Sequence, residues 1–239
     1  MRINWNLVKA VLLLGLVVFL YAFSSHKNNN RLVANLVVQF TGKENVYITT
    51  EMVNKLLIQN QDQLYNLPKD NLDLKEMEFL LESNDMIKSA QVYLTVNGEV
   101  RAKIEQKRPI ARVYSKAIFY IDEDGLWMPL SSQHSARVPL ITGVVGKGDL
   151  KDVYKMALKI YKDSFLRTYV TEIHQNENKE VSLRMRLLNF EILLGDLENL
   201  DQKMRNLKAF YQKAKKDKVL DIYKSVNLQF DNQVVCTKK

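Results

Sequence analysis

The stretch Ala90-Gln-Val-Tyr-Leu-Thr-Val96 is followed by Asn97-Gly98 and then by Val100-Arg-Ala-Lys-Ile-Glu105. Apolar and polar residues alternate on both sides of the Asn-Gly pair, which is the pattern of two β-strands that bury one face. Asn-Gly favours a two-residue type I′ turn, so the sequence predicts a β-hairpin. The residues predicted to face its core are Val92, Leu94, Val100, Ala102 and Ile104.

The residues before this hairpin predict one strand and two helices. Residues 33–40 are rich in β-formers, and Thr49 or Thr50 can cap a first helix. Asp73-x-x-Glu76 is a capping-box variant that begins a second helix, and Leu72 and Met77 are placed for a hydrophobic staple. The apolar side of this second helix is Leu74, Met77, Leu80 and Leu81. The predicted order is β-α-α-β-β.

The remainder of the chain predicts a mixed α/β domain with an antiparallel sheet and two helices. Strands are expected at 117–121, 126–128, 137–143, 169–174, 181–187, 190–194 and 224–230. Asp149 is expected to cap a helix that continues to Phe165, and the second helix spans 199–216. The fold class is therefore α+β. We expect domains at 27–113 and 114–232, followed by a C-terminal tail at 233–239.

The N-terminal segment predicts a membrane anchor. Residues 10–26 are apolar and uncharged up to Ser25, which suits a transmembrane helix preceded by a short cytoplasmic tail, 1–9. The alternative is a cleaved signal peptide, since Ala22-Phe-Ser24 fits a cleavage site. Arg2 and Lys9 favour a cytoplasmic start, whereas Lys27 and Arg31 oppose it. With a cytoplasmic start, the bulk of the chain is extracytoplasmic.

Composition narrows the function classes. The net charge is +8, but residues 1–43 carry five basic residues and no acid, so the charge favours a membrane rather than nucleic acid. The single cysteine, Cys236, excludes an intramolecular disulfide and any multi-cysteine metal site. The basic face of the 199–216 helix is expected to be solvated, or else to bind an acidic partner protein.

No residue pattern predicts catalysis. Asp122-Glu-Asp-Gly125 is typical of a turn rather than of paired catalytic carboxylates or a calcium loop. His134 lies near three serines, but no nucleophile elbow accompanies it. We therefore predict a non-enzymatic protein without a cofactor, metal ion, small-molecule substrate or nucleic-acid partner.

Several motifs together resemble a known family. The Asp73-capped helix, Ile87-Lys-Ser-Ala-Gln-Val-Tyr-Leu94 and the Asn-Gly turn resemble a POTRA domain. Tyr120-Ile-Asp-Glu-Asp-Gly125, Val138-Pro-Leu-Ile-Thr-Gly143 and the segment 225–235 resemble successive landmarks of the FtsQ/DivIB division proteins. The resemblance implies a bitopic protein of the inner (plasma) membrane at the midcell septum. Such a protein binds FtsB- and FtsL-like partners and helps control septal peptidoglycan synthesis.

Two other classes remain open. One is a POTRA-bearing export or outer-membrane assembly factor, although the residues after 114 contain too few alternating segments for a β-barrel. The other is a membrane-anchored extracytoplasmic enzyme, which would need a pocket with a perturbed acid or histidine.

The partner site is predicted at the last strand and the last helix. The 224–230 strand is expected to be an edge strand that can accept a strand from another protein. In FtsQ-like proteins this strand and the preceding helix receive FtsB, which implies a contribution from an aromatic residue at Phe230. The alternative is that Phe230 faces the core with Val226 and Leu228. The predicted site residues are Ser225, Val226, Asn227, Leu228, Gln229, Phe230, Tyr211 and Lys215.

Overall fold

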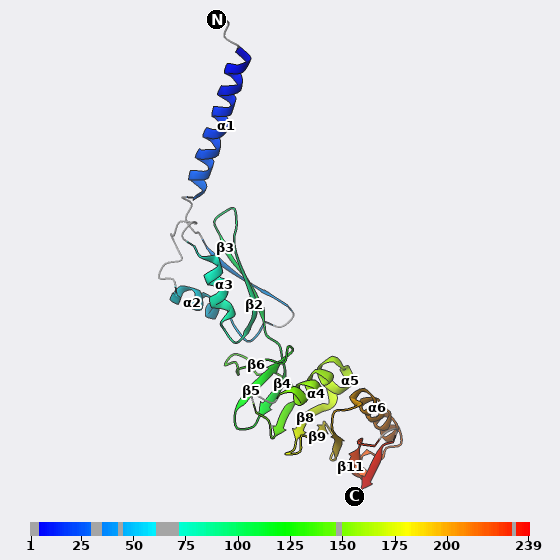
Figure 1. The fold of residues 1–239 in the computed structure, drawn as a ribbon. Helices are drawn as coiled ribbons and strands as arrows, with labels where there is room; N and C mark the ends of the chain where they lie inside the picture. The colour runs from blue at the N-terminus through cyan, green and yellow to red at the C-terminus, as the bar shows by residue number, and fades with distance from the viewer. Residues whose placement is uncertain (1–4, 30–34, 43–44, 61–71, 147–149, 231–232) are drawn as a thin grey trace. The chain divides into compact units, whose positions relative to one another are not determined.

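The computed structural model describes residues 5–29, 35–42, 45–60, 72–146, 150–230 and 233–239. The chain divides into two compact units, residues 1–106 and 107–239, which are treated separately below (Figure 1). The boundary falls earlier than the predicted one after Val113. The reason is that strand β4 (Pro109–Tyr114) pairs with strands of the second unit.

Helix α1 (Trp5–Asn29) contains the predicted anchor. Its segment Val8–His26 has 19 residues and a mean hydropathy of 2.1, and none of it is buried inside the protein. A helix of this length matches the ~30 Å hydrocarbon core of a bilayer. Because none of this segment is buried among the described residues, its apolar surface is suited to lipid.

The rest of the first unit is a three-stranded sheet with two helices. The strands are β1 (Leu36–Thr41), β2 (Ile87–Leu94) and β3 (Val100–Gln106), in the order β1-β3-β2. β3 pairs antiparallel with β2 and parallel with β1. Helices α2 (Thr50–Asn60) and α3 (Leu74–Glu82) lie in the connection between β1 and β2 (Figure 1). The predicted β-α-α-β-β order is confirmed.

The helix starts in this unit follow from local capping. The Thr49 hydroxyl accepts a hydrogen bond from the Met52 N–H at 3.4 Å, and Asp73 Oδ1 accepts one from the Glu76 N–H at 3.0 Å. Each cap satisfies a backbone donor that the first helical turn leaves without a partner. The predicted cap at Asp73 is confirmed.

This unit differs from the prediction at two points, one in its core and one in the hairpin loop. Met77 and Leu81 join the buried cluster with Val92, Ala102 and the other hairpin residues, but Leu80 does not. The hairpin loop is also longer than expected. The Thr95 N–H bonds Glu99 O, the Gly98 N–H bonds Thr95 O, and Gly98 has φ +89°. This geometry is a three-residue loop with a glycine bulge instead of a type I′ turn.

The second unit is built on a nine-stranded mixed sheet of order β12-β11-β10-β9-β8-β7-β4-β5-β6. The pairs β4–β7, β7–β8 and β10–β11 are parallel, so the expectation of an antiparallel sheet is wrong for these three pairs. Parallel neighbours need crossover connections, and helices supply them between β7 and β8 and between β10 and β11. The strands not yet given are β5 (Ile118–Asp122), β6 (Trp127–Met128), β7 (Leu140–Gly143), β8 (Val170–Gln175), β9 (Val181–Met185), β10 (Glu191–Gly195), β11 (Tyr223–Asn227) and β12 (Val235–Lys238).

Three α-helices occur in the described part of this unit, where two helices were expected: α4 (Lys151–Lys162), α5 (Ser164–Tyr169) and α6 (Leu200–Lys216). A short 3-10 helix, η2 (Leu220–Ile222), precedes β11. The expected helix through Phe165 is interrupted at Asp163, whose extended backbone ends α4. Its side chain then accepts hydrogen bonds from the Phe165 and Leu166 N–H groups and caps α5. Asp149, the expected cap of the first helix, lies outside the described residues.

The core of the second unit lies between the helices and one face of the sheet. Ile141, Ile173 and Ile192 of the sheet are fully buried and belong to one cluster with residues of α4 and α6. The opposite face carries Thr142, Glu172, His174 and Arg184, which are only partly buried or exposed. This alternation is typical of a sheet covered on one side.

Candidate partner-binding site

The predicted last strand is not an edge of the sheet. β11 pairs parallel with β10 on one side and antiparallel with β12 on the other. β12 consists of residues for which the sequence predicts a C-terminal tail. The edge-strand prediction for 224–230 is therefore wrong, because β12 occupies the side of β11 that was expected to be open.

The side chains at the end of β11 and just after it point in different directions. Val226 and Leu228 are buried in the core, whereas Phe230 is 47% exposed. The Leu228 N–H still bonds Leu193 O, but the Gln229 N–H donates to Asn227 Oδ1 at 2.8 Å. This side-chain turn ends the regular strand, so Phe230 does not continue the alternation. The alternative in which Phe230 faces the core is thus wrong.

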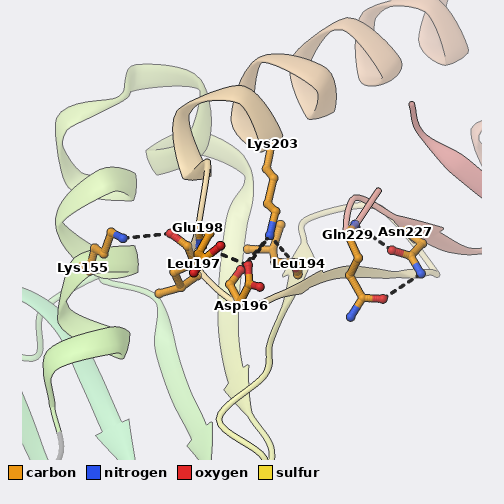
Figure 2. Close-up of polar contacts among 8 residues, drawn as sticks. All are labelled: Lys155, Leu194, Asp196, Leu197, Glu198, Lys203, Asn227 and Gln229. Carbon is orange, nitrogen blue, oxygen red and sulfur yellow. Dashed lines mark hydrogen bonds and ion pairs between the residues drawn. The ribbon is translucent and has the colours of Figure 1, made fainter. Parts of the chain in front are cut away.

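Gln229 lies over the carboxyl end of β10 (Figure 2). Gly195 there has φ +67°, and a Cβ atom on it would come within 2.6 Å of Gln229 Nε2. The Asn227 side-chain amide also donates to Gln229 Oε1 at 3.0 Å. Gln229 is one lining residue of a polar hollow of about 450 Å³. The hollow is also lined by Asp152, Lys155, Asp196, Glu198 and Lys203.

Lys203 is the buried charge at this hollow. Its ammonium group donates to Leu194 O, Asp196 O and Asp196 Oδ1 at 2.8–2.9 Å, which uses all three of its donors (Figure 2). The hydrogen bond from Lys203 lowers the pKa of Asp196, with a further bond from the Glu198 N–H. Lys155 reaches the same loop through Leu197 O at 2.8 Å. These bonds fix the end of β10 and the loop after it, from Leu194 to Glu198. β10 is the strand next to β11.

Tyr211 and Lys215 lie in a different hollow from Gln229. The rings of Phe165, Tyr169 and Tyr211 contact one another with centroids 5.0–5.2 Å apart. Lys215 Nζ lies 5.9 Å from the centre of the Tyr211 ring, and these residues line a hollow of about 500 Å³. Because the two hollows share no lining residue, the predicted site residues do not form one continuous pocket.

β12 is the outer strand at this end of the sheet and has no further strand neighbour among the described residues. Leu228 and Val226 direct their backbone groups toward β10, so Asn227 and Ser225 direct theirs toward β12. Their partners Val235 and Thr237 therefore face β11, and the N–H of Cys236 faces outward. Val235, 41% exposed, pairs with Asn227.

The pattern Val234-Val-Cys-Thr237 could have indicated this strand, but it is short and close to charged residues.

The other candidate residues have structural surroundings. Asp122 Oδ1 accepts hydrogen bonds from the Asp124 and Leu126 N–H groups and closes the predicted turn. Burial raises the pKa of Asp122, and burial likewise raises the pKa of the Cys236 thiol. His134 lies in an exposed loop. Within the described ranges, no three His, Cys, Asp or Glu side chains form a group that could hold a metal ion.

Comparison with known proteins addresses both units. A family model described as FtsQ/DivIB, C-terminal related matches residues 108–237, more than half of the chain. The chain belongs to the FtsQ/DivIB family. A POTRA-like domain model matches residues 35–105, and no curated protein matches the chain. The resemblance drawn from sequence motifs is confirmed for both units.

Family membership indicates the general role of this protein. FtsQ/DivIB and POTRA domains are generally non-catalytic, and the family is associated with protein–protein interactions in cell division. The N-terminal apolar helix Val8–His26 fits a single-pass membrane anchor in such a protein. The chain is thus a division-associated scaffold of the FtsQ/DivIB type.

Proposed function

We propose that this protein is a non-enzymatic, single-pass membrane scaffold that binds FtsB/FtsL-like division proteins at the septum and helps control septal peptidoglycan synthesis. The observation that carries the proposal is the strand edge at β12, with Phe230 and Val235 exposed nearby in the chain. An N-terminus in the cytoplasm and units outside it would bring this edge to the extracytoplasmic segments of such partners.

Strand addition is the binding mode that this edge supports. A partner strand would accept a hydrogen bond from the outward N–H of Cys236, while its side chains contact Val235 and Phe230. The main-chain bonds would give affinity, and the exposed apolar side chains would give specificity. In this proposal Gln229 does not offer its N–H to the partner strand, because that N–H is bonded to Asn227 Oδ1.

A binding experiment with the full chain in lipid nanodiscs tests this proposal. The titrant is the extracytoplasmic segment of an FtsB-like protein from the same cell. Phe230→Ala should weaken binding roughly tenfold or more, as loss of an interface anchor does. Leu187→Ala, which removes a more exposed apolar side chain elsewhere in the unit, should leave binding unchanged.

The strand-addition mode is tested at Cys236. Cys236→Pro removes the outward N–H, and proline is tolerated on an edge where that group faces solvent. Cys236→Ala removes only the thiol and serves as the matched control. Binding should be lost in the proline variant and kept in the alanine variant. If both Cys236→Pro and Phe230→Ala bind normally with the fold intact, the partner binds elsewhere.

A further inference from the structure

The first unit also has an edge strand, β2, and two of its outward backbone donors are occupied by side chains. The Val92 N–H donates to Glu78 Oε1 at 2.7 Å, and the Ala90 N–H donates to Glu82 Oε1 at 3.1 Å. Both glutamates belong to α3, and no further strand pairs with β2 among the described residues. The two side chains therefore take the places that the carbonyl groups of another strand would take.

The spacing of the two elements explains the match. Glu78 and Glu82 are four residues apart on one side of α3, which is ~6 Å along a helix. Ala90 and Val92 are two residues apart on β2, which is ~6.7 Å along a strand.

The pairing of the strands shows which way these N–H groups point. Since Val100 of β3 directs its N–H to Asn35 O, the even-numbered residues of β3 bond toward β1. Ala90 and Val92, paired with Ile104 and Ala102, therefore direct theirs away from the sheet.

We propose that Glu78 and Glu82 form a carboxylate cover that prevents β2 from pairing with β2 of a second copy of this chain. An antiparallel pair centred on Gln91 would join Ala90 N–H to Val92 O of the other copy, and the reverse, in a two-fold arrangement. The exposed apolar helix α1 supports this choice of partner, because anchoring in one membrane raises the effective concentration of copies. The proposal does not depend on what binds β12.

Disulfide cross-linking of the full chain in lipid vesicles tests the cover. A Cys236→Ser background removes the native thiol, and Gln91→Cys places a reporter opposite itself in the expected pair. Phe79→Cys on the exposed side of α3 is the control reporter. The test variant is Glu78→Ala/Glu82→Ala, and the matched control is Glu78→Gln/Glu82→Gln, whose amide oxygens can still accept both hydrogen bonds.

With the cover present, Gln91→Cys should give little cross-linked dimer. The double alanine variant should give roughly tenfold more dimer through residue 91, because four edge N–H groups in two copies gain strand partners. It should give no increase through residue 79, and the double glutamine variant should behave as the covered chain. Circular dichroism and hydrogen exchange at Val100 and Ala102 report whether the unit remains folded.

Each other result overturns the proposal. Strong cross-linking through residue 91 with both glutamates present means that the edge is not covered. No increase in a folded double alanine variant means that the glutamates only hold α3 to the sheet. Equal increases at residues 79 and 91, or an unfolded variant, mean that the glutamates support the fold. A double glutamine variant that cross-links like the alanine variant excludes the hydrogen bonds as the cause.

Discussion

The two units end their sheets in opposite ways. In the POTRA-like unit, the Ala90 and Val92 N–H groups of edge strand β2 donate to two glutamates of α3. In the FtsQ/DivIB-type unit, edge strand β12 has no described side chain bonded to its outward Cys236 N–H. Uncovered edges invite pairing with other chains, and proteins usually block the edges that they do not use. The difference supports the proposals that β12 is the edge kept for a partner and that β2 is protected.

The largest effect is expected from a change that loosens α3, the helix that carries Glu78 and Glu82. Leu81 of α3 is fully buried, so Leu81→Ala should lower the free energy of unfolding of the POTRA-like unit by about 2–5 kcal/mol. Leu80→Ala, on the same helix but outside the core cluster, should cost less than half as much. Hydrogen exchange of β3 amides measures both. Equal costs would mean that α3 packs in another orientation, and the glutamate assignment would fail with it.

The next effect concerns the support behind the open edge. Lys203 bonds two backbone carbonyls at the end of β10, so Lys203→Met leaves them without a partner and should cost about 1–3 kcal/mol. Lys213→Met, an exposed change on the same helix, is the control. Exchange at β10 and β11 amides should rise in the first variant only. Unchanged exchange in Lys203→Met would show that β11 and β12 do not depend on this contact.

A pH-dependent effect of intermediate size is expected at Asp163. Partial burial alone would raise its pKa, but bonds from Lys208 and from the Leu166 N–H favour the charged form and hold the pKa of Asp163 below its usual range. Its stabilising effect is therefore present above the ordinary aspartate pKa of ~3.9 and is lost as the pH falls through the lower folded-state value.

Asp163→Asn keeps a capping oxygen but removes the charge. It should cost roughly 1–2 kcal/mol near neutral pH and much less in acid, as measured by urea unfolding from pH 7 to pH 2. If the free energies of unfolding of the unmodified protein and of Asp163→Asn differ by the same amount at every pH, the contribution of the Lys208–Asp163 pair is contradicted.

The smallest effect is expected on the face of the hairpin that points away from the core. Tyr93 pairs with Arg101 across the two strands and is partly exposed. Tyr93→Ala should cost about 0.2–1 kcal/mol, the range of cross-strand pairs. Thermal unfolding provides the measurement, with Val92→Ala as the buried counterpart. A larger cost at Tyr93 than at Val92 would mean that the hairpin register is shifted by one residue.

Local patterns in the sequence predicted most elements, because alternation and capping depend on neighbouring residues. The hairpin, the Asp73 cap and the Asp122 turn are examples. Strand β12 is harder to predict, because its pattern Val234-Val-Cys-Thr237 is short and close to charged residues, and without it β11 resembles an edge strand. Glu78 and Glu82 were also missed, because two glutamates on an amphipathic helix look like part of its solvated face. Their role depends on a strand that follows them by 8 to 14 residues.

The comparison of the two edges is tested most directly by hydrogen exchange of the full chain in nanodiscs, with and without the extracytoplasmic segment of an FtsB-like partner. The account predicts that the partner slows exchange of the outward Cys236 amide and of its β12 neighbours, while the Ala90 and Val92 amides of β2 exchange at the same rate in both samples. Protection of Ala90 and Val92 by the bound partner, with no change in β12, would contradict it.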